Sequence, residues 1–153
     1  MTAIPQNAAE DNFTLEAPGR YNYLAAIRQA VLDVCARAGI AQERAAQLEM
    51  AVDEACSNII EHSYGGEKGT QRLAEPDALR VHVIRTRERI VVEIFDRGTG
   101  FNFDATPGVA PDNYIDERRR RGLGMYIIRC FVDDVSYERG TPQGNCLRLT
   151  KLL

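Results

Sequence analysis

The chain has 153 residues, a length that one domain with a substantial core accounts for. Apolar residues make up 44 % and charged residues 27 % of the sequence, the balance of an ordinary globular protein. The formal net charge of -3 excludes the global positive field that nucleic-acid-binding domains carry, so we expect no direct nucleic-acid partner.

Membrane insertion and secretion are not expected either. No apolar run approaches the ~18 residues of a membrane-spanning helix. Residues 1–11 lack the basic and apolar segments of a signal peptide, and we expect them to be flexible. The four cysteines are widely spaced, and three lie in apolar periodic runs. This usage favours reduced thiols in a cytoplasmic protein over a zinc site or a disulfide framework.

The first predicted elements are a short strand over residues 12–17 and a helix over residues 20–38. Pro18 and Gly19 separate the two. In the helix, apolar residues recur at steps of three and four, and Gly39 supplies a C-terminal stop. We expect this helix to cover a sheet, because it carries no residue of obvious chemistry.

A second helix is predicted over residues 41–63, and it carries two polar groups of interest. Glu54 and Asn58 lie one turn apart in an otherwise apolar helix, so they share a face. An Asn in this position can hold Mg²⁺ through its carbonyl oxygen, and a Glu one turn away can accept a proton. The alternative is an ordinary solvated polar face.

Two strands follow, over residues 78–86 and 89–95, joined tightly enough to predict an antiparallel hairpin. The second strand is β-branched and ends on Asp96, with Gly98 and Gly100 beyond it. A carboxylate at a strand end can meet a ligand from a rigid platform, and glycines let the backbone approach that ligand closely. Taken alone, the same residues are typical of an ordinary strand-to-loop turn.

Residues 101–121 show no sustained period and end in four consecutive arginines, as expected for a functional or mobile connection. Gly122 and Gly124 are then predicted to open an apolar helix. The free backbone N–H groups and the dipole of a helix start favour phosphate, although glycine is also a common N-cap. The arginines can neutralise phosphate or form a solvated face. Residues 135–138 and 146–152 are predicted to form a closing hairpin.

Three of these stretches, in this order and spacing, resemble a known superfamily. The sequences EACSN (54–58), DRGTG (96–100) and GLGM (122–125) look like the N, G1 and G2 boxes of the GHKL ATPases, which include gyrase, histidine kinases and the MutL repair proteins. The short chain, the sequence EHSYGG after the first box and the closing strand over 145–152 look most like the anti-sigma-factor serine kinases of the RsbW and SpoIIAB type. The resemblance extends from about residue 13 to residue 153.

The resemblance implies an α+β fold of the GHKL (Bergerat) ATPase type. This fold is a two-layer α/β sandwich with a mixed, mostly antiparallel sheet and helices on one face. Residues 12–153 would form this single domain, with an ATP lid at about residues 101–121. The nucleotide would lie between a helix and the lid.

The resemblance also implies roles for particular residues. Asp96 would accept a hydrogen bond from the adenine amino group, and Asn58 would bind Mg²⁺ that bridges the phosphates. Glu54 would be the general base that activates a serine on a partner, and Arg120 would stabilise charge on the transferred phosphoryl group. The other implied cofactor-binding residues are Gly98, Gly100, Arg121, Gly122, Leu123, Gly124, Met125 and Asn145. Asn145 stands where the family commonly has Thr, and it can replace that hydrogen bond.

The activity that the resemblance implies is an ATP- and Mg²⁺-dependent protein serine kinase. It would phosphorylate a small anti-sigma-factor antagonist with an acceptor serine and would sequester a sigma factor. Since the family tends to dimerise, a homodimer stays open. One alternative is a regulatory binding module that responds to nucleotide or has lost it; the Glu54/Asn58 pair argues against this. Another is the catalytic half of a split histidine kinase, which the short chain disfavours.

Overall fold

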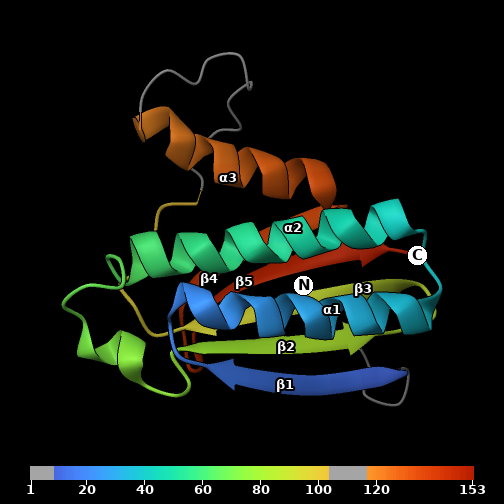
Figure 1. Cartoon of the computed structure of the whole chain (residues 1–153), viewed down its shortest axis with the longest axis horizontal. Helices are drawn as coiled ribbons and strands as arrows, with labels where there is room; N and C mark the ends of the chain where they lie inside the picture. The colour runs from blue at the N-terminus through green and yellow to red at the C-terminus, as the bar shows by residue number, and fades with distance from the viewer. Residues whose placement is uncertain (1–8, 104–116) are drawn as a thin grey trace.

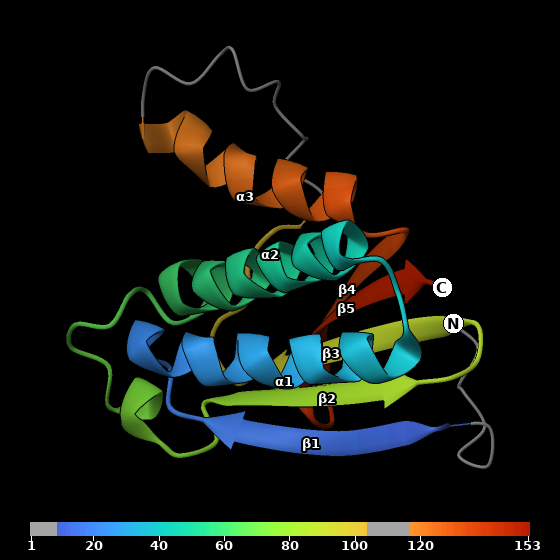
Figure 2. The ribbon, with the colours of Figure 1, turned by 45° about the vertical axis from the view of Figure 1, so that its right-hand side comes forward.

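The computed structural model describes residues 9–103 and 117–153. For residues 117–123 it describes the backbone alone, and for the others it describes the side chains as well. These residues form a sheet of five strands with helices on one face (Figure 1). Helices α1 and α2 lie directly over the sheet, and α3 lies beside α2, as the turned view also shows (Figure 2). None of the described helices is long and apolar enough to cross a membrane.

The strand order is β1-β2-β3-β5-β4, and all four pairings are antiparallel. The expected sheet was mixed and mostly antiparallel, whereas the described strands contain no parallel pair. The predicted hairpin of β2 and β3 is confirmed. The strands are β1 (Asp11–Ala17), β2 (Leu79–Arg85), β3 (Arg89–Asp96), β4 (Asp134–Thr141) and β5 (Gly144–Leu152).

The helices are α1 (Leu24–Ala38), α2 (Gln42–Asn58) and α3 (Glu117–Phe131). Gly39 ends α1 in the left-handed region at φ 71°, which confirms the predicted stop. The second predicted helix continues beyond α2 as a π-helical turn, Ile59–Ser63. Such a turn inserts one extra residue into the backbone spiral and often lies at a functional site.

The core lies between the sheet and the helices. Inward-facing residues of the two central strands are buried, among them Ile90, Val92 and Ile94 on β3 and Leu147 and Leu149 on β5. Because side chains alternate along a strand, Asp96 and Asn145 continue these two inward series at the strand ends. Two polar groups therefore lie on the helix side of the sheet, at one end of the core.

The closing hairpin is tighter than the sequence predicts. β4 extends to Thr141 and β5 begins at Gly144, so only Pro142 and Gln143 form the turn. An irregularity in the pairing between Glu138 and Thr141 allows both strands to continue.

The predicted start of the third helix is wrong. Helix α3 begins at Glu117, so Gly122 and Gly124 lie inside it and do not open it. The physical reason is that Glu and Arg, which fill residues 117–121, are strong helix formers and extend the helix toward its N-terminus. Residues 104–116 of the predicted lid, and residues 1–8 of the predicted flexible N-terminus, lie outside the described residues.

Candidate functional site

The carboxylate of Asp96, at the end of β3, is the centre of the site and is 2 % exposed. Its Oδ1 accepts three hydrogen bonds: from the Ser63 hydroxyl, from the Gly98 N–H at 2.9 Å and from the Asn145 amide at 3.0 Å. Its Oδ2 is buried, and no described residue donates a hydrogen bond to it. A buried carboxylate oxygen without a partner is costly. A ligand N–H at this position would satisfy it.

The loop after Asp96 lies directly on the end of the π-helical turn that follows α2. The Thr99 N–H donates to the Ser63 carbonyl at 2.8 Å. A Cβ atom at position 98 would overlap both the carbonyl and the hydroxyl oxygen of Ser63, so only glycine fits. Gly100 follows at φ 75°, a conformation that L side chains rarely adopt. The two glycines of the predicted box are thus explained by one close approach and one backbone turn.

Asn145 lies opposite Asp96 in the register of β3 and β5. Its amide nitrogen donates to Asp96 Oδ1 and to the Gly98 carbonyl, each at 3.0 Å, and its oxygen accepts from the Gly140 N–H at 3.1 Å. Both amide protons are used within the protein. Asn145 therefore supports Asp96 and its loop, and only its oxygen has capacity left for a ligand.

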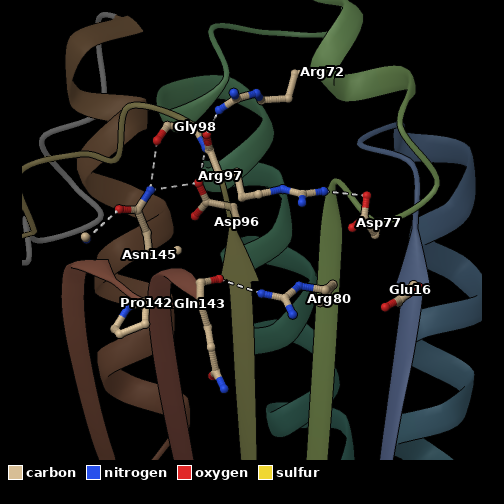
Figure 3. A pocket seen from close by; sticks show the side chains of 12 residues that line it. Glu16, Arg72, Asp77, Arg80, Asp96, Arg97, Gly98, Pro142, Gln143 and Asn145 are labelled. Atoms are coloured by element: carbon tan, nitrogen blue, oxygen red, sulfur yellow. Dashed lines mark hydrogen bonds and ion pairs between the residues drawn. The ribbon is translucent and has the colours of Figure 1, made fainter.

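A cavity of about 590 Å³ lies behind this cluster (Figure 3). Arg80 lines it and alternates with the buried Leu79 and Val81, so its side chain lies on the sheet face without helices, whereas Asp96 and Asn145 face the helices. The cavity therefore lies at the end of the sheet. Arg97 pairs with Asp77 at 2.5 Å in its wall. This ion pair ties the loop that follows Asp96 to the segment that precedes β2. The lining residues are Glu16, Arg72, Asp77, Arg80, Asp96, Arg97, Gly98, Gly140, Pro142, Gln143, Gly144 and Asn145.

A second cluster joins α2 to α3. The Asn58 side chain is only 8 % exposed, and its Nδ2 donates to the sulfur of Met125 at 3.5 Å. A Cβ atom at Gly124 would lie 3.0 Å from Glu54 Oε2 and 3.1 Å from both amide atoms of Asn58. Gly124 thus lets the α3 backbone rest on the Glu54/Asn58 pair.

Burial raises the pKa of Glu54 above its ordinary value, and the negative charge of Asp53 raises it further. A raised pKa makes the carboxylate a better proton acceptor than an exposed Glu. Glu54 also lines a small surface hollow of about 220 Å³ between α1 and α2, together with Arg28, Glu49, Met50 and Asp53. The Glu54 side chain is therefore close to solvent on that side.

The described fold brings most of the predicted site residues into these two clusters. Asp96, Gly98, Gly100 and Asn145 form the first, and Glu54, Asn58, Gly124 and Met125 form the second. The backbone of Arg120, Arg121, Gly122 and Leu123 belongs to α3, whereas their side chains lie outside the described ones. Since α3 begins at Glu117, the argument that the glycine pair supplies free N–H groups at a helix start does not hold for this arrangement.

Sequence reasoning missed two residues that shape the site. Ser63 contacts Asp96 and the glycine loop. The Tyr64 hydroxyl donates to the Ala78 carbonyl at 2.7 Å and accepts from the Arg97 N–H at 2.9 Å. Both belong to the sequence EHSYGG, which served only as a mark of resemblance. Its position after the second helix was the one available signal.

The residues present fit Mg²⁺ as a metal held mainly by its nucleotide. The hydrogen bond of Asn58 uses its nitrogen, so its carbonyl oxygen is available as a ligand. The described residues contain no group of three or more His, Cys, Asp or Glu side chains that could hold a metal by themselves. Phosphate and water oxygens would have to complete the coordination shell.

The fold and the site define an ATPase domain of the histidine kinase type, and comparison with known proteins agrees. The chain belongs to the family described as "Histidine kinase-like ATPase domain", whose family model matches residues 17–151. This confirms the resemblance drawn from the three boxes.

Within this family, the chain is similar to serine-protein kinases. The chain is 27 % identical to the serine-protein kinase RsbW of Bacillus pumilus (strain SAFR-032) over 152 residues, which cover 96 % of this chain and 89 % of the relative. It is 26 % identical to RsbW of Bacillus subtilis (strain 168), covering 94 % and 86 %. A solved structure of the RsbU and RsbW domains of Rv1364c from Mycobacterium tuberculosis superposes with a TM-score of 0.64 at 14 % identity, over 93 % of this chain and 32 % of that one. This last likeness confirms the predicted α+β fold.

Proposed function

We propose that this protein is an ATP- and Mg²⁺-dependent protein serine kinase that also acts as an anti-sigma factor. The observation that carries the proposal is the buried, unpartnered Oδ2 of Asp96 at the end of β3. The family of this chain is an ATPase family, and its relatives include serine-protein kinases, which supports the same proposal. ATP use follows from the family, and the finer assignments below are ours.

The Asp96 cluster suits an adenine base. Three donors already occupy Oδ1, so Oδ2 is the oxygen left for a ligand. An exocyclic amino group would donate to it, whereas a carbonyl at the same ring position would place one acceptor against another. Because the site is buried, this hydrogen bond would be stronger than the same bond in water.

The α2 cluster suits phosphoryl transfer. Asn58 would hold Mg²⁺, which when bound neutralises the phosphate charge. Glu54, one turn away, would take the proton of the attacking serine hydroxyl, and its raised pKa favours that transfer. Arg120 would stabilise the charge on the transferred group, and Arg121 would contribute a phosphate contact from α3.

The relatives named "Serine-protein kinase RsbW" support a protein substrate that carries an acceptor serine. We assign to this chain a small anti-sigma-factor antagonist as the phosphorylated substrate and a sigma factor as the sequestered protein. A cytoplasmic location fits these partners. A homodimer is a further expectation from the resemblance.

One observation favours a second candidate, a binding module without kinase activity. The α3 backbone at Gly124 rests on Glu54 and Asn58 at contact distance, so this arrangement leaves no space for phosphate between them. A chain locked in this state would bind partners without transferring phosphate.

Calorimetric titration with ATP and Mg²⁺ is the first test of the kinase proposal. We expect the wild-type protein to bind and the Asp96→Asn variant to lose affinity by about 100-fold. In that variant the side-chain oxygen can keep the three donors of Oδ1, while the nitrogen opposes the adenine amine. Absence of binding to the wild-type protein would sink the kinase proposal and leave the binding module. If the wild-type protein binds ATP, mass spectrometry of the phosphorylated partner would distinguish phosphoserine from phosphohistidine.

A further inference from the structure

Ser63 lies where the π-helical turn after α2, the end of β3 and the loop that follows β3 meet. It ends the π-helical turn that follows α2, is 2 % exposed, and contacts the loop that follows β3. Its hydroxyl donates to Asp96 Oδ1 and accepts from the Gly100 N–H at 2.9 Å. A hydroxyl has only one proton. Because the Gly100 N–H occupies the acceptor side, that proton points to Asp96.

The result is a relay from the Gly100 N–H through the Ser63 hydroxyl to the Asp96 carboxylate. Its members polarise one another in a buried environment, which strengthens the relay. The Ser63 carbonyl also accepts from the Thr99 N–H at 2.8 Å and from the Thr99 hydroxyl at 3.0 Å. The backbone of Ser63 thus fixes the loop, while its hydroxyl fixes the carboxylate.

We propose that Ser63 is a positioning residue for recognition of the nucleotide base: its hydroxyl holds Asp96 so that Oδ2 alone faces a ligand N–H donor. The other donors to Oδ1 are the Gly98 N–H in the loop after β3 and the Asn145 amide on β5 (Figure 3). Ser63 is the donor that comes from the π-helical turn Ile59–Ser63, which continues α2, the helix that carries Glu54 and Asn58. Through Ser63, the helical segment that carries Glu54 and Asn58 therefore also orients the carboxylate of Asp96.

The inference rests on the proposed function, because it assumes that a nucleotide base meets Asp96. The test compares two ligands, ATP and purine riboside 5′-triphosphate, which lacks the 6-amino group. The wild-type protein should prefer ATP by about tenfold to a hundredfold, the value of one hydrogen bond to a charged group. The Ser63→Ala variant should lose most of this preference, with weaker binding of ATP and the same affinity for the analogue.

Thr99→Ala is the matched control, because it removes a hydroxyl that donates to the Ser63 carbonyl and leaves Asp96 untouched. It should keep the wild-type preference for ATP. Ser63→Cys retains the side-chain shape with a weaker donor, so its preference should fall between wild type and Ser63→Ala. Thermal unfolding of each variant checks that it is folded, and Ser63→Cys serves if Ser63→Ala is not.

Equal losses for both ligands in the Ser63 variants would overturn the proposal, because they would assign to Ser63 a purely structural role. An unchanged ATP preference in both variants would overturn it as well. Either result would leave the kinase proposal intact. A wild-type protein that binds neither ligand would overturn both.

Discussion

The two clusters of the site differ in how completely they are formed. Around Asp96, donors from the π-helical turn after α2, from β5 and from the loop after β3 converge on a single oxygen. Around Glu54 and Asn58, the contacts are the backbone of α3 at Gly124 and one long hydrogen bond to the Met125 sulfur. The first cluster is held by short polar bonds, and the second is covered by packing.

This difference suggests that the Asp96 cluster serves nucleotide binding and that the Glu54/Asn58 cluster serves phosphoryl transfer. A preorganised carboxylate recognises a base at little cost in reorganisation. If phosphate binds at the Glu54/Asn58 pair as proposed, α3 would have to move away from the pair. The base side of the site would then set affinity, whereas the position of α3 would set reactivity.

The largest effect is expected for Glu54→Ala. Loss of the base should reduce serine phosphorylation by about 10²–10⁴-fold, while ATP affinity stays unchanged because the Asp96 cluster is untouched. Phosphoproteomics of cells that carry the variant measures the first quantity, and calorimetry measures the second. Glu54→Gln, which keeps the shape of the side chain, should behave in the same way. Loss of ATP binding in Glu54→Gln would show that the two clusters do not act separately.

A smaller effect is expected for Gly124→Ala. The new Cβ would lie 3.0 Å from Glu54 Oε2 and 3.1 Å from the Asn58 amide, so either α3 or the pair must shift. Such overpacking costs about 1–3 kcal/mol, against a gain of ~1 kcal/mol in helix propensity. We expect ATP turnover to fall by about tenfold if the pair is displaced.

The control for Gly124→Ala is Cys130→Ala, at an exposed position on the same helix. Turnover and urea unfolding of this control should match the wild type. If Gly124→Ala raised turnover, α3 would be displaced from the pair and the pair itself would remain intact. That outcome would sharpen the view of α3 as the covering element.

The smallest effect concerns the pKa of Glu54. Burial raises this pKa first, and the charge of Asp53 adds to it. Asp53→Asn removes the second contribution, so the Glu54 carboxyl should titrate at lower pH than in the wild type and should be ionised over a wider range. NMR titration of ¹³C-labelled glutamate side chains follows this directly, with Glu54→Gln identifying the resonance.

Asp33→Asn is the control for this titration, because Asp33 is an exposed aspartate on α1 whose partner is Gln29. It should leave the Glu54 resonance unchanged. An upward shift in Asp53→Asn would contradict the assigned cause.

Much of the fold could be predicted from local patterns. Alternating β-branched residues predicted β2 and β3, and apolar steps of three and four predicted α1 and α2. The start of α3 was predicted too late, because two glycines were taken to open a helix whose preceding Glu and Arg residues already form it. A pair of glycines is a weak signal for a helix start when strong helix formers precede it.

What the sequence by itself determined about this protein is the periodic and local part of its site. Glu54 and Asn58 share a face because a helix repeats every 3.6 residues, and Asp96 ends a strand because glycines follow it. Only the tertiary structure decided that Asn145 lies opposite Asp96 and that Ser63 reaches the same oxygen. These contacts join residues 33 and 49 positions apart. They depend on strand register and on the packing of α2 against the sheet, which no local pattern encodes.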